Sequence, residues 1–257
     1  MQTLALLGIE EEIKKVVVAG DWHGNLLWMQ RVLRAAAGDG HKVIVHVGDL
    51  AVLWPGASKF TTILKRLLEE LDLLFIFADG NHDVHPALRA LPLNADGFGV
   101  ISDRLLYAPR GHRWSLSGQR FGALGGAYSV DRRSRVQGKS WWIGEEVTDR
   151  DVHRLGRERL DVLISHEVPM GIDVVSTIGG RLPEMIEREA EICRRLVRDA
   201  VRNTEPHLVF SGHWHQRRTG LMPGMATRVH VLDREFFSGN LVLLDLATLA
   251  VEDYKPV

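Results

Sequence analysis

Cysteine is almost absent from this chain of 257 residues, since Cys193 is the one residue of its kind. A single thiol excludes an internal disulfide, a four-cysteine zinc site and an iron–sulfur cluster. It also fits a reducing compartment, and we predict a cytoplasmic location. Any metal that this chain binds is therefore expected to have oxygen and nitrogen ligands.

Long apolar runs and an excess of one charge are also lacking. No apolar stretch approaches the roughly 20 residues that a membrane-spanning helix needs, so no membrane partner is expected. The apolar run at residues 1–8 has no basic residue before it and is followed by acidic residues 10–12, so a signal peptide is not expected. With 32 Lys and Arg against 33 Asp and Glu, the formal net charge of −1 provides no global field for nucleic acid, although a local basic patch can still form.

Histidine, in contrast, is unusually frequent, with twelve residues. Several histidines stand in polar corners that follow five short apolar runs, at residues 16–19, 43–47, 73–77, 162–164 and 208–210. Short apolar runs that end in glycine and Asp or Asn are typical of buried strands. Amphipathic patterns at 26–37 and 59–71 separate the first three runs, which predicts parallel strand–helix–strand units. Since ligands bind at the carboxyl ends of such strands, we expect the five corners to meet at one rim.

The rest of the chain lacks the regular alternation of apolar runs and amphipathic helices. Residues 114–124 alternate around a Ser-Gly-Gln turn, which predicts a hairpin. A charged amphipathic helix is expected at 184–202, and strands that close the fold are expected between 228 and 252. No linker or internal repeat divides the sequence. We therefore predict one domain over residues 1–257, with 100–160 as a hairpin and loop insertion on the substrate side.

The five corners supply carboxylate, amide and imidazole side chains, namely Asp21, His23, Asp49, Asn81, His82, His166, His213 and His215. Such a set without thiolate suits Mn²⁺, Fe, Zn²⁺ or Ni²⁺ better than Ca²⁺ or copper(I). The spacing of two in Asp21-x-His23 and His213-x-His215 turns both side chains of each pair to one side of an extended segment. Eight such residues are too many for one tetrahedral ion, but they suit two ions that share a carboxylate, and Asp49 is the natural bridge.

Each motif alone also has a plainer interpretation. Asp21-x-His23 fits an ordinary turn, Asn81 fits a helix N-cap, and the pair at 213 and 215 fits a surface turn. Ligation is favoured because the motifs occur together, in order, and each at the carboxyl end of an apolar run. Two such ions would lower the pKa of a water between them toward about 7, which would provide a nucleophile for a phosphorus ester without a protein nucleophile.

This ordered set resembles the five signatures of calcineurin-like metallophosphoesterases. The matching segments are Asp21-Trp22-His23-Gly24-Asn25, Gly48-Asp49, Gly80-Asn81-His82-Asp83, His166 with Pro169, and Gly212-His213-Trp214-His215. The resemblance spans residues 16–215 and implies an α/β fold, a four-layer αββα sandwich of two mixed sheets flanked by helices, with a binuclear metal site at the carboxyl-end loops. It also implies the site residues: Asp21, His23, Asp49 and His215 for one ion, Asp49, Asn81, His166 and His213 for the other, and His82 as the catalytic histidine.

The sequence departs from the protein Ser/Thr phosphatase branch of that family. There the Gly-Asp motif continues to Arg-Gly, whereas Asp49 is followed by Leu50 and Ala51 and no arginine. The chain also lacks room for the extra domains of Mre-type nucleases. A small bacterial or phage-type phosphoesterase is the better analogy, and we predict hydrolysis of phosphodiesters or nucleotides, cyclic nucleotides included. Two divalent transition-metal ions, Mn²⁺ before Fe, Zn or Ni, are the expected cofactors, and a histidine is the expected general acid.

Substrate-binding candidates follow the double glycine at 125–126, namely Tyr128, Arg132, Arg133 and Trp141. The arginines suit phosphate and the tryptophan suits a stacked nucleobase, although a solvated basic loop anchored by a tryptophan fits equally. Trp22 and Trp214 are expected to wall the site or to pack beneath it. His85 is expected at the surface before Pro86, with a contact to the ligand residues or to substrate as the alternative.

Two other functions stay open at this stage. An RNA or DNA end-processing nuclease would need a locally built basic groove. A non-catalytic scaffold of the same fold is disfavoured because the ligand set is complete. The oligomeric state is not indicated by the sequence.

Overall fold

A computed structural model describes residues 13–175 and 183–256 of the chain. Its strands are β1 (Lys15–Ala19), β2 (Val43–His46), β3 (Leu74–Phe77), β4 (Gly99–Ser102), β5 (Leu105–Tyr107), β6 (Arg113–Leu116), β7 (Gln119–Leu124), β8 (Val162–Ser165), β9 (Leu208–Ser211), β10 (Arg218–Leu221), β11 (Arg228–Val231), β12 (Leu241–Asp245) and β13 (Val251–Asp253). Its helices are α1 (Leu26–Gly38), α2 (Ser58–Glu70), α3 (His85–Arg89), the 3₁₀ turn η2 (Arg132–Ser134), α4 (Asp149–Leu155) and α5 (Glu184–Thr204). None of these helices is long and apolar enough to cross a membrane.

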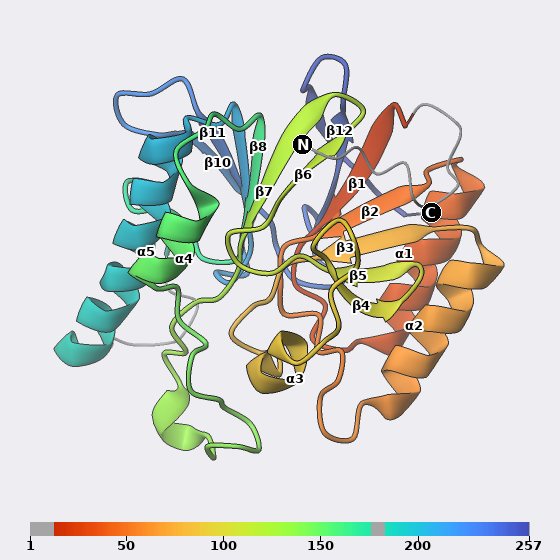
Figure 1. The fold of residues 1–257 in the computed structure, drawn as a ribbon, viewed down its shortest axis with the longest axis horizontal. Helices are drawn as coiled ribbons and strands as arrows, with labels where there is room; N and C mark the ends of the chain where they lie inside the picture. Colours follow the sequence, from red (N-terminus) through yellow and green to blue (C-terminus); the bar gives the residue numbers. More distant parts are fainter. Residues whose placement is uncertain (1–12, 176–182, 257) are drawn as a thin grey trace.

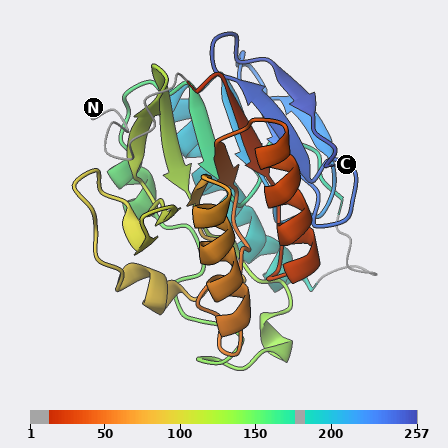
Figure 2. The same cartoon turned by 90° about the vertical axis from the view of Figure 1, so that its right-hand side faces the viewer.

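The strands form two mixed sheets that pack face to face between helices (Figures 1 and 2). The first sheet has the order β13-β12-β1-β2-β3-β5-β4, and the second has the order β10-β11-β9-β8-β7-β6. Strands β1, β2 and β3 are parallel in the first sheet, and β7, β8 and β9 are parallel in the second. Helices α1 and α2 flank one side of the molecule, and α4 and α5 flank the other (Figure 1). The predicted αββα sandwich is thus confirmed.

Alternation along each strand explains the four layers. In β1, Val17 packs with α1 and α2, whereas Val16 and Val18 belong to the core between the sheets. In β9, Phe210 faces that same central core, while Val209 packs with α4 and α5. Both faces of each sheet are therefore buried, which is why the strand sequences are almost uninterrupted apolar runs.

Residues 99–124 contribute strands to both sheets. β4 and β5 extend the first sheet at its edge, and the predicted hairpin forms β6 and β7 at the edge of the second. The next segment, residues 125–148, contains η2 and projects beyond the sheets at the lower edge of Figure 1. The division of the chain into one domain with an insertion at 100–160 stays a prediction.

A buried ion pair joins the end of β3 to the segment after β5. The Arg110 guanidinium donates to Asp79 Oδ2 through Nε at 2.9 Å and Nη2 at 2.6 Å, and both side chains are less than 5% exposed. Tyr107 donates its hydroxyl to Asp79 Oδ1 at 3.0 Å. Arg110 also donates to the backbone carbonyls of Glu145 and Glu146. This cluster therefore ties residues 145–146 to the strand end that precedes Gly80.

Asp79→Asn is expected to destabilise the protein by about 3–5 kcal/mol, because Arg110 would keep a buried charge without its partner. Burial alone would raise the pKa of Asp79, but the Arg110 charge, the nearby His85 and the hydrogen bonds from Arg110 and Tyr107 together outweigh it and hold the pKa below its ordinary value. The stabilisation is therefore present above the unfolded pKa of about 4 and is lost as the pH falls. Urea unfolding at pH 7 and at acid pH measures both effects.

Asp72→Asn is the matched control, since Asp72 pairs with Lys42 and Arg104 at the surface with 59% of its side chain exposed. Exposed pairs contribute about 0–1 kcal/mol. Equal losses in the two variants would contradict a special contribution from the buried pair.

Candidate metal centre

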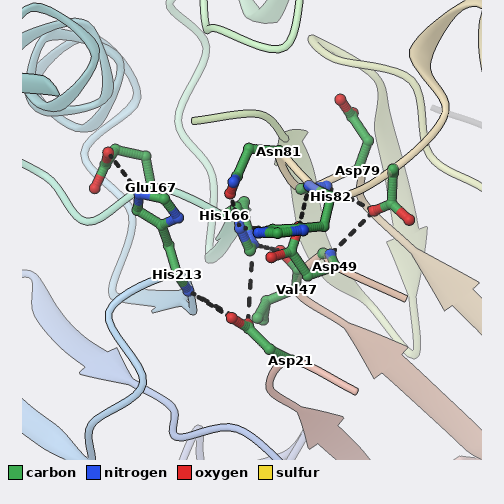
Figure 3. Close-up of polar contacts among 12 residues, drawn as sticks. Asp21, Val47, Asp49, Asp79, Asn81, His82, His166, Glu167 and His213 are labelled. Carbon is green, nitrogen blue, oxygen red and sulfur yellow. Dashed lines mark hydrogen bonds and ion pairs between the residues drawn. The ribbon is translucent and has the colours of Figure 1, made fainter. Parts of the chain in front are cut away.

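The polar corners after β1, β2, β3, β8 and β9 meet at one edge of the two sheets. Figure 3 shows Asp21, Asp49, Asn81, His166 and His213, which come from these five corners, with side chains close together. All of them are buried except the His213 side chain, which is 11% exposed. The parallel strands bring together residues as far apart in the sequence as 21 and 213, as expected for one rim.

Several of the predicted ligands have an unusual backbone. His23, Asp49, His213 and His215 have φ of 44°, 57°, 68° and 47°, in the left-handed region. For residues with a Cβ this conformation costs about 1–2 kcal/mol each, so surrounding contacts must hold it. His23 is held by its N–H, which donates to the carbonyl of Asp49 at 2.8 Å. Such strained positions cluster at functional sites.

Asp83 holds the backbone at Asp49 and at two neighbouring positions of the site. Its fully buried carboxylate accepts the N–H groups of Asp49 at 3.0 Å, Ala51 at 2.7 Å and Gly80 at 2.8 Å. Burial, together with the nearby Asp49 charge, raises the pKa of Asp83 to about 7. The sequence alone indicated no separate role for Asp83. Its place as an acidic residue at the end of the motif was the one feature that could have indicated a carboxylate accepting backbone N–H groups.

The glycines of the motifs are explained by close approach. A Cβ on Gly80 would lie 2.1 Å from Asp49 Oδ1, and one on Gly212 would lie 2.1 Å from Asp21 Oδ1. Any side chain at either position would therefore displace a predicted ligand.

One compact group of ligand atoms contains Asp21, His23 and His215, whose atoms all lie within 4.8 Å of one another. His215 Nε2 is 3.3 Å from Asp21 Oδ2, and His23 Nε2 is 3.4 Å from Asp49 Oδ2. The imidazoles of His23 and His215 are 23% and 29% exposed, so this group opens toward solvent.

A second compact group contains Asp21, Asp49 and His166, again within 4.8 Å. His166 Nε2 lies 3.4 Å from Asp49 Oδ1 and 3.1 Å from Asn81 Oδ1. This group is fully enclosed, since none of its side chains is more than 1% exposed. Asp49 thus turns one carboxylate oxygen toward each of two histidines, His166 and His23.

These separations fit divalent ions. Ligand atoms at about 2.1 Å from an ion in octahedral geometry are about 3 Å apart, close to the 3.1–3.4 Å observed. The donors are carboxylate, amide and imidazole, as transition metals of borderline hardness prefer. Asp21 belongs to both compact groups, and Asp49 contacts a histidine of each, so the donor set and its spacing suit divalent metal binding at this rim.

Oxygen atoms behind the histidines orient the rings. His23 Nδ1 contacts Glu235 Oε2 at 3.0 Å, and His166 Nδ1 contacts the carbonyl of Val47 at 3.1 Å, which leaves Nε2 of both rings facing the centre. His213 lies outside both compact groups, and its Nε2 is 3.7 Å from Glu167 Oε2. Such outer partners fix the orientation of metal-binding imidazoles.

Glu167 and Glu235 were missed in the sequence. Glu167 Oε2 is buried without a hydrogen-bond partner in the described structure, so it is available to His213. Glu235 lies 212 residues from His23 and outside every motif, so only the fold reveals its contact. Glu167 stands directly after His166, but no spacing rule distinguishes it from an ordinary acidic residue.

Without cations, the carboxylates of the site favour protonated histidines. Burial lowers the pKa of His23, but hydrogen bonds to Asp49 and Glu235 outweigh it and raise the pKa to about 11. For His166, burial is likewise outweighed by the charges of Asp49 and Asp21, and the pKa rises to about 9. The neighbouring carboxylates therefore favour the cationic form of both rings, with both ring nitrogens protonated, at pH 7.

Metal loading at pH 7 is expected to release about two protons per chain, because a ligating imidazole must be neutral. The affinity should rise with pH, since fewer protons then compete for His23 and His166 up to their pKa values of about 11 and 9. Titration calorimetry with Mn²⁺ in buffers of different ionisation enthalpy counts the protons. Heats that do not depend on the buffer would contradict this expectation.

His82 stands beside the centre and outside both compact groups. Its backbone N–H donates to Asp49 Oδ1 at 2.7 Å, and its ring lies 5.5 Å from that of His23, centroid to centroid. Trp54 stacks near it at 6.4 Å with an interplanar angle of 29°, and Arg135 contacts its Nε2. Trp54 was not singled out in the sequence, because nothing in its surroundings distinguishes it from a surface tryptophan.

Three of the four predicted substrate-binding residues pack together, and the fourth, Arg133, is exposed. Arg132 pairs with Glu145 at 2.6 Å and with Glu146, and it lies over the rings of Tyr128 and Trp141 at 4.4 and 4.7 Å. Its charge is therefore already neutralised within the segment. A role in substrate binding stays a prediction for all four.

Two tryptophans of the motifs and one histidine also have definite places. Trp22 is fully buried and donates to Asn240 at 3.2 Å, whereas Trp214 donates to Glu167 at 2.7 Å. His85 is 1% exposed and contacts the carbonyl of Gly80 at 2.9 Å, so the expectation of a surface position was wrong. The cause is Asp79, whose Oδ2 lies 3.4 Å from His85 Nε2 and holds the first turn of α3 in the interior.

Comparison with known proteins supplies independent findings. The family described as calcineurin-like phosphoesterase matches residues 14–217. A dimetal phosphatase from Danio rerio has a TM-score of 0.62 at 13% identity and covers 96% of this chain and 98% of its own. The protein TT1561 of Thermus thermophilus has a TM-score of 0.59 at 16% identity, with coverage of 95% and 100%. At such identities these structures show a shared fold. A search of curated protein sequences found no match.

Proposed function

The chain belongs to the calcineurin-like phosphoesterase family, and from this premise we propose that it hydrolyses phosphodiesters or nucleotides at a centre of two metal ions. Metal-dependent phosphoester hydrolysis is the activity of the family, and the class of ester is our proposal. The observation that supports it best is the Asp49 carboxylate, whose Oδ1 and Oδ2 face His166 and His23, respectively, at 3.4 Å each.

We propose that seven side chains fill eight ligand positions at the two ions, with Asp49 serving both. Asp21, His23, Asp49 and His215 would hold one ion, and Asp49, Asn81, His166 and His213 would hold the other. We propose Mn²⁺ as the ion at both positions, because the donor set is oxygen and imidazole without thiolate. When bound, the ions supply an activated water and neutralise the charge that builds up on the phosphoryl group.

His82 is the proposed general acid. Since its side chain lies outside the ligand groups, it is free to meet the leaving oxygen of the substrate. An alkoxide from a diester is a poor leaving group and gains from a proton delivered as the bond breaks. Because the Arg135 guanidinium can only donate, His82 Nε2 accepts from it and Nδ1 is the nitrogen that carries the proton of the neutral ring. Asp49 Oδ1 accepts from the backbone N–H of His82 and holds its position.

An aromatic group on the substrate is supported by Trp54. This half-exposed ring stacks beside His82, and its edge meets Trp142 at 4.8 Å. A nucleobase or aryl group that leaves from the His82 side would lie against Trp54, where stacking contributes about 1–3 kcal/mol. Nucleotides and cyclic nucleotides fit this arrangement.

A panel of esters tests the proposal. The protein is stripped of metal, loaded with Mn²⁺ and assayed on bis-p-nitrophenyl phosphate, p-nitrophenyl phosphate, 2′,3′- and 3′,5′-cyclic nucleotides and a single-stranded oligonucleotide. We expect kcat/KM for diesters at least equal to that for monoesters, because the Arg-Gly extension of the protein phosphatase branch is missing after Asp49. Hydrolysis of phosphoserine peptides with no activity on any diester would refute the proposal. Preferred cleavage of the oligonucleotide would favour a nuclease.

A further inference from the structure

One cation from the segment at 125–148 reaches the metal centre. The Arg135 guanidinium contacts His82 Nε2, and only 9% of its side chain is exposed. Its Nη1 donates to Ser129 Oγ at 3.3 Å, and the same hydroxyl accepts from Asn81 Nδ2 at 3.0 Å. Arg135 therefore borders both side chains of the Asn81-His82 pair.

The direction of this guanidinium is fixed by a carboxylate. Asp131 accepts from Arg135 Nε at 2.9 Å and from Nη2 at 2.8 Å, a fork that uses one edge of the group. Asp131 itself is 46% exposed, so water screens part of its charge. Asp131 and His82 use the Nε and Nη2 donors of Arg135. Ser129 uses one Nη1 donor, so within the described part of the chain the second Nη1 donor is left for an anion. Arg132, in contrast, is committed to Glu145 and Glu146.

The segment that carries Arg135 is held in place by the buried carboxylate of Glu145. Fully buried Glu145 accepts from the N–H of Ser129 at 3.0 Å, from Ser129 Oγ at 2.8 Å and from Arg132. Arg110 holds the backbone carbonyl of Glu145 at 2.8 Å. Ser129 and Arg135 are therefore placed by a rigid base, as a residue that must align a substrate requires.

We propose that Arg135 binds a non-bridging oxygen of the substrate's phosphoryl group beside His82, an inference that rests on the proposed phosphoesterase function. A guanidinium suits this task because its remaining Nη1 N–H can donate a charge-assisted hydrogen bond to a phosphoryl oxygen, and because the group stays charged at any working pH. The segment after Asp49 offers no arginine, and Arg135, 86 residues further along the chain, brings a guanidinium to this rim. The Ser129 hydroxyl lies next to it as a neutral neighbour.

Phosphate affinity is the direct measurement. Inorganic phosphate is titrated calorimetrically into the Mn²⁺-loaded wild type and into Arg135→Gln and Arg135→Lys. We expect Arg135→Gln to weaken phosphate binding by roughly 10- to 150-fold, as for the loss of charged hydrogen bonds, and Arg135→Lys to recover part of it. KM for a diester should rise in the same order, while metal content and melting temperature stay unchanged.

Lys139→Gln is the control, because it removes one positive charge from an exposed position of the same segment. It should leave the phosphate affinity unchanged. No phosphate binding to the wild type, or equal affinity in the wild type and Arg135→Gln, would overturn the assignment. A lower kcat with unchanged phosphate affinity and KM would also overturn it, since Arg135 would then only position His82. If the wild type binds phosphate through Arg135 but hydrolyses no ester, the proposed function fails and the anion site stands.

Discussion

Asp49→Asn is expected to reduce the metal content from two ions per chain to at most one and to lower kcat by about a thousandfold or more. Both carboxylate oxygens are engaged in the geometry, Oδ1 toward His166 and Oδ2 toward His23. An amide offers one oxygen and a donating nitrogen, so it cannot serve two cations. Losing metal-based charge stabilisation costs several kcal/mol in the transition state. Elemental analysis of Mn²⁺-loaded and desalted protein, together with steady-state kinetics, measures both effects.

The same variant should remain folded, because an asparagine oxygen can still accept the N–H of His82 and the backbone contacts with Asp83 are unaffected. Asp72→Asn, a change of an exposed carboxyl, serves as the control for both metal content and rate. Two ions retained in Asp49→Asn would eliminate the bridge, whatever the effect on rate.

The parallel strands and their shared rim were predictable because the information is local, whereas the four-layer sandwich followed from the family resemblance. Nearly uninterrupted apolar runs such as 16–19 and 208–210 form strands that are buried on both faces. The crossover helices make β1, β2 and β3 parallel, so the polar residues after each strand must come to the same edge. Asp49 lies next to the polar residues after β1 and β3 because β2, the strand it follows, lies between these two strands.

Contacts set by tertiary packing were not predictable in the same way. Arg132 and Arg135 stand three residues apart in one basic segment, yet one pairs with Glu145 and the other reaches His82. That difference depends on where Glu145 is held by Arg110, which no local pattern encodes. Glu235 meets His23 for the same reason, through the connection between β11 and β12.

His82 is the residue for which chemistry and metal binding are expected to separate. Its backbone N–H binds Asp49, but its ring lies in neither compact ligand group. Burial is the main cause that lowers the pKa of His82, with Arg135 acting in the same direction and Asp49 opposing it. A bound phosphate ester brings negative charge next to the ring and Arg135, which favours the protonated form that a general acid needs.

His82→Ala should therefore keep both ions and nearly the wild-type melting temperature, yet lose about 10²- to 10⁴-fold in kcat on an unactivated diester such as a cyclic nucleotide. On bis-p-nitrophenyl phosphate the loss should be smaller, because p-nitrophenolate leaves readily without a proton. Asn81→Ala, in contrast, should weaken the binding of one ion, since Asn81 Oδ1 lies 3.1 Å from His166 Nε2, a proposed ligand of that ion. His153→Ala, a change of an exposed histidine on α4, should have no effect on either substrate.

Metal content and kcat, measured for these variants on both diesters, distinguish the possible roles of His82. Loss of an ion in His82→Ala would identify the ring as a ligand and remove the general-acid assignment. An equal loss of rate on the activated and the unactivated diester would instead point to stabilisation of the phosphoryl charge, a task that does not depend on the leaving group. A defect confined to the poor leaving group is the result that only a proton donor explains, since the proton is needed in proportion to the basicity of the departing oxygen.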